Sequence, residues 1–157
     1  MSIFAQRSRE KEIMDDLNCS GPVLEQTLRE LKTINRWLGG NKVTTQGLSE
    51  VVQRFPQEQY RVVDLGCGGG DMLAVMQDWA QQEQVSMQLI GADANAHTIA
   101  LAQQRQQQLQ GIRWQVANVF DPTFFEEQVD IATCTLFTHH FTDEELVTLF
   151  QGLKQKV

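Results

Sequence analysis

One glycine-rich segment contains the residues best suited to hold a ligand. Residues 64–71 are Asp-Leu-Gly-Cys-Gly-Gly-Gly-Asp, and they follow an apolar run typical of a buried strand and precede a pattern typical of a helix. A glycine-rich turn from strand to helix lets the backbone approach a ligand closely and directs the amides of the helix N-terminus at it. This context predicts a ligand-binding loop, whereas a glycine run alone would indicate only a turn.

Two carboxylates in this loop indicate which ligand it suits. The dinucleotide-binding fingerprint requires glycine at its first, third and sixth positions, and Gly66 and Gly68 meet the first two requirements. The sixth position is Asp71, which would repel a pyrophosphate, and Asp64 on the preceding strand adds a second negative charge. The loop therefore favours a ligand with a cationic amino group and no phosphate. An NAD-dependent oxidoreductase is the less favoured alternative.

Four segments in chain order resemble the motifs of class I S-adenosylmethionine-dependent methyltransferases. The first is the acid followed by Gly-x-Gly-x-Gly in residues 64–71, and the second is Ile90–Asp93, with an acid at the end of the next strand. The third is Val116–Asp121, and the fourth is Val129–Phe141. The resemblance implies S-adenosylmethionine as the methyl donor, S-adenosylhomocysteine as the product, and no metal. The residues that it places at the donor are Asp64, Gly66, Cys67, Gly68, Gly70, Asp93, Ala94, Asn118, Val119 and Cys134.

Three of these residues have alternative interpretations. The resemblance implies that Asp93 accepts hydrogen bonds from both ribose hydroxyls and that Asn118 contacts the adenine. Alternatively, Asp93 caps the helix that follows it, and Asn118 is an ordinary turn residue. Cys67 is expected to be a small filler residue of the loop, because no nearby histidine motif indicates an activated thiol.

Three basic side chains are candidates for contact with the reacting groups. His139 and His140 are candidate general bases, although in the resembling enzymes such a pair usually shapes the pocket. Thr138 stands where those enzymes often have leucine. Arg36, near the end of an amphipathic helix, is a candidate for binding the carboxylate of the cofactor or the substrate, and a surface position is its alternative.

The pattern of apolar residues divides the chain into two parts. Residues 1–57 are expected to form a helical cap whose apolar stripe packs on the remainder. Residues 58–157 alternate short apolar runs with amphipathic helices, which predicts an α/β fold with a Rossmann-like, doubly wound parallel sheet. The stripe comprises Leu24, Leu28, Leu31 and Leu38. The expected strands are Arg61–Leu65, Met87–Asp93, Ile112–Ala117 and Val129–Leu136. Beyond the striped helix, the expected helices are Thr45–Arg54, Asp71–Gln82, Ala96–Leu109 and Asp143–Gln155, the last with a capping box of Thr142 and Glu145.

Composition limits the partners and the location. The 157 residues carry a formal net charge of −7, so no nucleic-acid partner is expected. No apolar stretch approaches the roughly 20 residues of a membrane helix, and the charged N-terminus lacks the apolar centre of a secretory signal. A cytoplasmic protein without membrane attachment is therefore expected. The three cysteines form no CxxC pair and have no zinc-ligand spacing, so neither a disulfide nor a metal is predicted.

Methyl transfer to a small-molecule acceptor is the predicted function. The motifs of amino-methylating DNA enzymes and of protein arginine methyltransferases are absent from the sequence. The alternative is a non-catalytic module that binds the donor or a partner. Because the resembling fold has further strands after the fourth, the domain is expected to be incomplete, with Val129–Leu136 at an exposed sheet edge. Such an edge can pair with another chain, so a homodimer through it is a further expectation.

Overall fold

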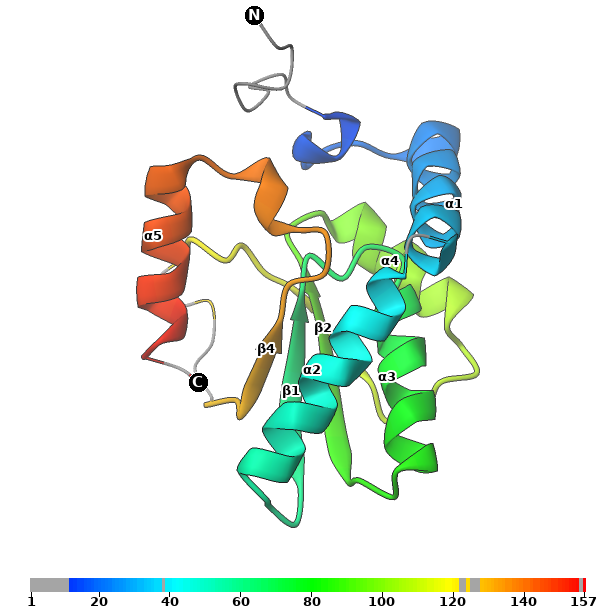
Figure 1. The fold of residues 1–157 in the computed structure, drawn as a ribbon. Helices are drawn as coiled ribbons and strands as arrows, with labels where there is room; N and C mark the ends of the chain where they lie inside the picture. The colour runs from blue at the N-terminus through cyan, green and yellow to red at the C-terminus, as the bar shows by residue number, and fades with distance from the viewer. Residues whose placement is uncertain (1–11, 38, 122–123, 125–127, 156) are drawn as a thin grey trace, which may run out of the picture.

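The computed structural model describes residues 12–37, 39–121, 124, 128–155 and 157. Its centre is a parallel sheet of four strands in the order β3-β2-β1-β4, with helices on both faces (Figure 1). The strands are β1 Tyr60–Leu65, β2 Met87–Asp93, β3 Arg113–Val116 and β4 Ile131–Thr133. The helices are η1 Ile13–Asp15, α1 Gly21–Trp37, α2 Gly40–Arg54, α3 Asp71–Gln82, α4 Ala96–Arg105, η2 Thr138–His140 and α5 Asp143–Leu153. The predicted Rossmann-like α/β fold with N-terminal helices is confirmed.

The strand register brings the loops that carry the motifs to one edge of the sheet. β1 pairs with β2 from Tyr60–Met87 to Leu65–Ala92. On its other side, β1 pairs with β4 from Val62–Ile131 to Asp64–Thr133. Because all these strands are parallel, the segments that follow their carboxyl ends meet at the same edge.

Two apolar clusters hold the helices on opposite faces of the sheet. Successive residues of a strand point to opposite faces, so Val62 and Val63 enter different clusters. The first cluster joins β1, β2 and β4 to α2, α3 and α4 through Leu48, Val62, Met72, Leu73, Met76, Leu89, Ile99 and Ile131. The second comprises Val63, Leu65, Ile90, Ala92, Phe124 and Val129, with Leu153 of α5 packed against it. Burying a side chain of this size contributes about 1.5–3 kcal/mol.

Most element boundaries lie close to their predicted positions. β2 and α3 have the predicted ranges, and the predicted capping box is present, because Thr142 Oγ1 accepts from the Glu145 N–H and Glu145 Oε2 accepts from the Thr142 N–H. α2 begins at Gly40 rather than Thr45. Gly39, directly before α2, adopts the left-handed conformation with a φ of 80°.

β4 is shorter than the predicted strand Val129–Leu136. It lies at one edge of the described sheet, as expected, and has only β1 as a pairing partner there. Leu136 adopts a φ of 51°, a left-handed conformation that turns the chain out of the strand direction. β3 and α4 also end before the predicted boundaries.

The apolar stripe of α1 is buried at its N-terminal half. Leu24 and Leu28 are 0% and 2% exposed, whereas Ile34 and Trp37 near the C-terminal end are 44% and 80% exposed. Leu38 lies outside the described residues. No described helix is both long enough and apolar enough to cross a membrane.

Candidate functional site

The glycine loop between β1 and α3 has a backbone that requires glycine. Gly66, Gly68 and Gly70 have φ values of 64°, 51° and 74°, which L-residues with side chains rarely adopt. The Cys67 N–H donates to the Ala92 carbonyl at 3.0 Å, and this bond fixes the loop to the end of β2. The alternation of left-handed glycines therefore shapes a concave backbone at the start of α3.

The surrounding side chains approach this loop closely. A Cβ atom at Gly66 would collide with the ring of Phe137, and one at Gly70 would lie 2.5 Å from the ring of Trp114. Phe137 itself packs edge-on against Phe141 with ring centroids 4.8 Å apart. Glycine is thus required both for conformation and for space.

Asp93 lies at the carboxyl end of β2, directly against the loop. Its Oδ2 accepts from the Gly68 N–H at 3.2 Å, and its Oδ1 accepts from the Asn95 N–H at 2.9 Å. Burial raises the pKa of this carboxyl, while the two amides and the nearby His140 act to lower the pKa. Asp93 does not cap α4, because the Asn95 side chain accepts from the His97 N–H at 2.8 Å and the Thr98 N–H at 3.4 Å. The capping alternative for Asp93 is therefore wrong.

Asp64 is a buried carboxyl group beneath the loop. It is 3% exposed, and its Oδ1 accepts from the Thr133 hydroxyl of β4 at 2.7 Å. Burial raises the pKa of Asp64 to about 7; the Thr133 hydrogen bond opposes this shift, and the charge of Asp93 adds to it. A cationic group bound near Asp64 would stabilise its ionised form.

The two cysteines near the loop carry protonated thiols at neutral pH. Burial, followed by the charges of Asp93 and Asp64, raises the pKa of Cys67 well above its ordinary value. Burial and then Asp64 raise the pKa of Cys134 to about 11. Neither residue is an activated nucleophile, which agrees with the interpretation of Cys67 as a filler residue.

Asn118 and Val119 follow β3 beside this site. The Ala117 N–H donates to the Asp93 carbonyl at 2.9 Å, which places the start of this segment next to β2. The exposed Asn118 accepts from the Phe120 N–H through its Oδ1 at 3.0 Å, as expected for a turn residue. Val119 packs on the second apolar cluster. The amide nitrogen of Asn118 and the second lone pair of its oxygen could still bind a ligand.

The N-terminal segment, here residues 12–37, covers the glycine loop. Leu28 of α1 lies over Gly68 and Gly69, where added Cβ atoms would be 3.4 Å and 3.9 Å from its side chain. The Asn95 amide donates to the Cys19 carbonyl at 2.9 Å. Lys32 of α1 forms an ion pair with Asp71 at 2.9 Å. Arg36 lies in the last turn of α1, and the position of its side chain is outside the described part of the chain.

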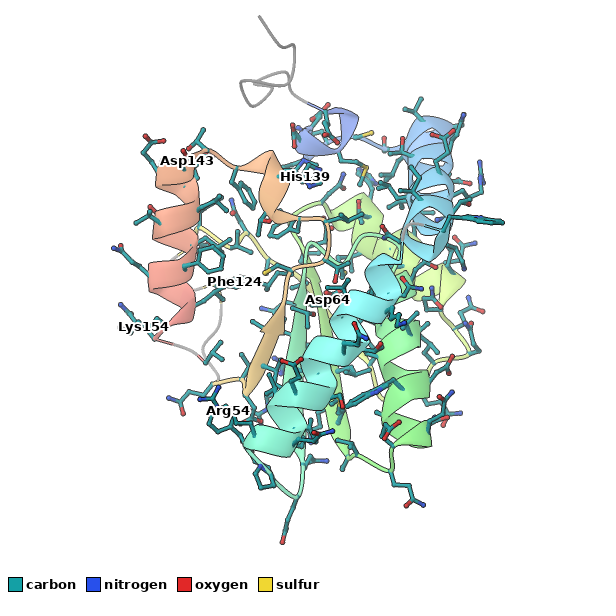
Figure 2. The ribbon with its side chains drawn as sticks, in the orientation of Figure 1. Arg54, Asp64, Phe124, His139, Asp143 and Lys154 are labelled. Carbon is teal, nitrogen blue, oxygen red and sulfur yellow. The ribbon has the colours of Figure 1, made fainter. Side chains whose placement is uncertain are left out.

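His139 and His140 lie in η2, after the turn that ends β4. Figure 2 shows His139 beside the N-terminal segment that contains η1. His139 Nε2 is 3.6 Å from Glu12 Oε1, and His140 Nδ1 is 2.8 Å from Asp15 Oδ1. The His140 contact is a short electrostatic one without the direction of a hydrogen bond. Both histidines therefore face carboxylates of the N-terminal segment.

A hollow of about 460 Å³ lies between α2 and the segment that contains β4. Its walls are residues of α2 on one side and the consecutive residues 131–136 on the other. Thr44 and Thr135 join the two walls through a hydrogen bond of 2.9 Å between their hydroxyls.

Comparison with known proteins identifies the family. Residues 62–157 match the family model described as "Methyltransferase domain". The chain belongs to this methyltransferase family. Among curated protein sequences no match was found.

Solved methyltransferase structures share the fold. The magnesium protoporphyrin IX methyltransferase of Synechocystis PCC 6803, solved with bound S-adenosylmethionine, has a TM-score of 0.65 and 15% identity over 96% of this chain and 74% of its own. A protein of Methanococcus maripaludis, assigned to the S-adenosyl-L-methionine-dependent methyltransferases, has a TM-score of 0.62 and 12% identity over 97% of this chain. The plantazolicin methyltransferase BamL, in complex with S-adenosylhomocysteine, has a TM-score of 0.60 and 22% identity over 85% of this chain. This chain spans 63% of the M. maripaludis protein and 46% of BamL.

The predicted methyltransferase family is thus confirmed by the family match, and the similar solved structures share the predicted Rossmann-like fold. In this methyltransferase domain, the predicted residues of the glycine loop, Asp93, Ala94 and Cys134 lie around one edge of the sheet. Sequence reasoning missed Thr133, Asn95, Glu12 and Asp15. Asn95 carried a local signal, since asparagine directly before a helix is a preferred cap. The other three depend on contacts between distant parts of the chain.

Proposed function

We propose that this methyltransferase domain binds S-adenosylmethionine and transfers its methyl group to a small-molecule acceptor. The observation that carries the proposal is the position of Asp93. Its carboxylate lies against the glycine loop and takes no part in capping α4, which suits a carboxylate that accepts hydrogen bonds from ribose hydroxyls. Asp64 lies beneath the same loop, where the cationic amino group of the donor would be favoured and would stabilise the ionised form of the carboxyl.

The chain's own contribution to catalysis is mainly the positioning of the reactants. When bound, S-adenosylmethionine supplies a methyl group that its sulfonium already activates. Holding an acceptor in line with that methyl group can lower the barrier by roughly 7–11 kcal/mol. The N-terminal segment, with Leu28 over the loop, restricts the access of water. His139 and His140 are candidates for accepting a proton from an acceptor hydroxyl or for shaping its pocket.

Three observations support a small molecule as the acceptor. The net charge of −7 opposes the binding of a nucleic-acid backbone. The methyltransferases of similar fold include one named for magnesium protoporphyrin IX and one in complex with a triazolic plantazolicin analogue. Furthermore, the described part of the N-terminal segment covers the glycine loop, which narrows the access that a macromolecule would need there.

Calorimetry with variants of Asp93 tests donor binding. We expect Asp93→Ala to weaken S-adenosylmethionine binding by about 1.5–3 kcal/mol, or roughly tenfold to hundredfold, because charge-assisted hydrogen bonds to the ribose are lost. Asp78→Ala, at an exposed position of α3, is the matched control and should bind as the wild type does. Unchanged affinity in a folded Asp93→Ala protein would contradict the assignment.

A turnover assay separates an enzyme from a module that only binds the donor. Mass spectrometry of molecules retained in the purified protein would identify candidate acceptors. Release of S-adenosylhomocysteine in the presence of such an acceptor is the expected result. Tight donor binding without any release across the candidates would favour the non-catalytic alternative.

A further inference from the structure

Three metal-binding side chains from distant parts of the sequence meet beside η2. One carboxylate oxygen of Glu12 and one nitrogen of each ring of His139 and His140 all lie within 4.8 Å of one another. The two imidazole rings have centroids 4.1 Å apart. The sequence predicted no metal because its cysteines lack the spacing of zinc ligands. Spacing along the chain does not reveal ligands that the fold brings together.

We propose that Glu12, His139 and His140 form a binding site for a divalent transition metal ion of the zinc type. Two imidazoles and one carboxylate are a ligand set that proteins use for zinc and for non-haem iron. The hard ions magnesium and calcium prefer oxygen ligands only and fit this set poorly. The carboxylates of Glu12 and Asp15 offset the charge of a divalent cation.

To close around an ion, the three ligand atoms would have to approach one another only by a short distance. Zinc–ligand bonds of about 2.0–2.2 Å place tetrahedral ligand atoms about 3.3–3.6 Å apart, so no pair needs to approach by more than about 1.5 Å. The side chains of His139 and Glu12 are 47% and 57% exposed, so an ion in solution can reach them. His140 is more buried, and Asp15 lies 2.8 Å from its Nδ1. This carboxylate adds a negative charge beside the imidazole, which favours a cation bound there.

An ion at this site would join the N-terminal segment to the loop after β4. Three protein ligands leave a fourth position open, as in catalytic zinc sites, for water or an oxygen of a small molecule. His140 also lies close enough to Asp93 to lower the pKa of that carboxyl, so the site adjoins the proposed donor pocket. The inference does not depend on the proposed function, because the ion would bind without any methyl donor.

Titration of the chelator-treated full chain with zinc chloride, in the absence of donor, tests the proposal. We expect one equivalent to bind, and we expect Glu12→Gln and His139→Gln each to weaken binding at least tenfold. His97→Gln removes an exposed histidine of α4 and serves as the control, with unchanged binding. Circular dichroism of each metal-free variant shows that the fold is intact.

Cobalt(II) as a spectroscopic probe excludes the thiols of the chain as the ligands. The expected spectrum has weak ligand-field bands and no intense thiolate-to-cobalt charge-transfer band. Thiolate bands, binding that is retained in both ligand variants, or an absence of binding would each overturn the proposal.

Discussion

Replacing Asp64 by asparagine should remove much of the pH dependence of stability. Burial raises the pKa of Asp64 from an ordinary value of 3.8 to about 7. The folded chain therefore keeps a proton that the unfolded chain releases between about pH 4 and pH 7. Raising the pH through this window favours the unfolded state, and above about pH 7 both states are ionised and the effect levels off.

The pKa of Asp64 sets the size of this effect. One pKa unit corresponds to about 1.4 kcal/mol, so the contribution of Asp64 to the free energy of unfolding should fall by about 2–3 kcal/mol between pH 5 and pH 8. The raised pKa of Asp93 adds a smaller change of the same sign. In the Asp64→Asn variant the amide oxygen would still accept the hydrogen bond from Thr133, so this variant should fold.

Urea unfolding followed by circular dichroism at several pH values measures these free energies. The wild-type protein should lose stability from pH 5 to pH 8, and Asp64→Asn should lose about 2–3 kcal/mol less over the same range. Asp78→Asn, at an exposed position, should show the wild-type dependence. If Asp64→Asn showed the same loss as the wild type, the carboxyl would titrate at an ordinary pKa and the reasoning would fail.

Three further predictions concern the loop, the N-terminal segment and the sheet edge. Gly66→Ala should destabilise the fold by about 1–3 kcal/mol or more in urea unfolding, because its φ of 64° and the ring of Phe137 both oppose a side chain; an unchanged midpoint would contradict this. Leu28→Ala should lower the free energy of unfolding by about 2–5 kcal/mol, whereas Ile34→Ala, on the exposed end of α1, should lower it much less. Equal losses would show that the buried stripe does not hold α1. A homodimer through β4 predicts a dimeric mass in light scattering, and a monodisperse monomer would count against it.

The central elements could be predicted because their signals are local. The boundaries of β2 and α3 follow from an apolar run that ends at Asp93 and from a glycine loop that ends before Asp71. The position of Asp93, the candidate for binding the ribose, then follows from the rule that ligands bind at the carboxyl ends of parallel strands. For β2 and α3, the local sequence pattern and the packing in the fold favour the same structure.

The remaining features depend on contacts that no local pattern contains. The end of β4 at Thr133 reflects the single pairing partner of the strand and the turn at Leu136. The contacts of His139 and His140 with the N-terminal segment depend on how η1 packs on η2, which is a tertiary arrangement. Periodicity along the chain predicts which residues are buried and does not predict such long-range pairs.

The side chain of Asn95 uses both ends of its amide at once. Its oxygen caps α4, and its nitrogen holds the Cys19 carbonyl of the N-terminal segment at 2.9 Å. Aspartate at this position would preserve the cap but has no hydrogen to donate, so it would keep the helix and release the segment. The two functions can therefore be separated by exchanging a single nitrogen for an oxygen. Among related sequences, asparagine or aspartate at this position would distinguish chains whose N-terminal segment is tethered here from chains in which it is not.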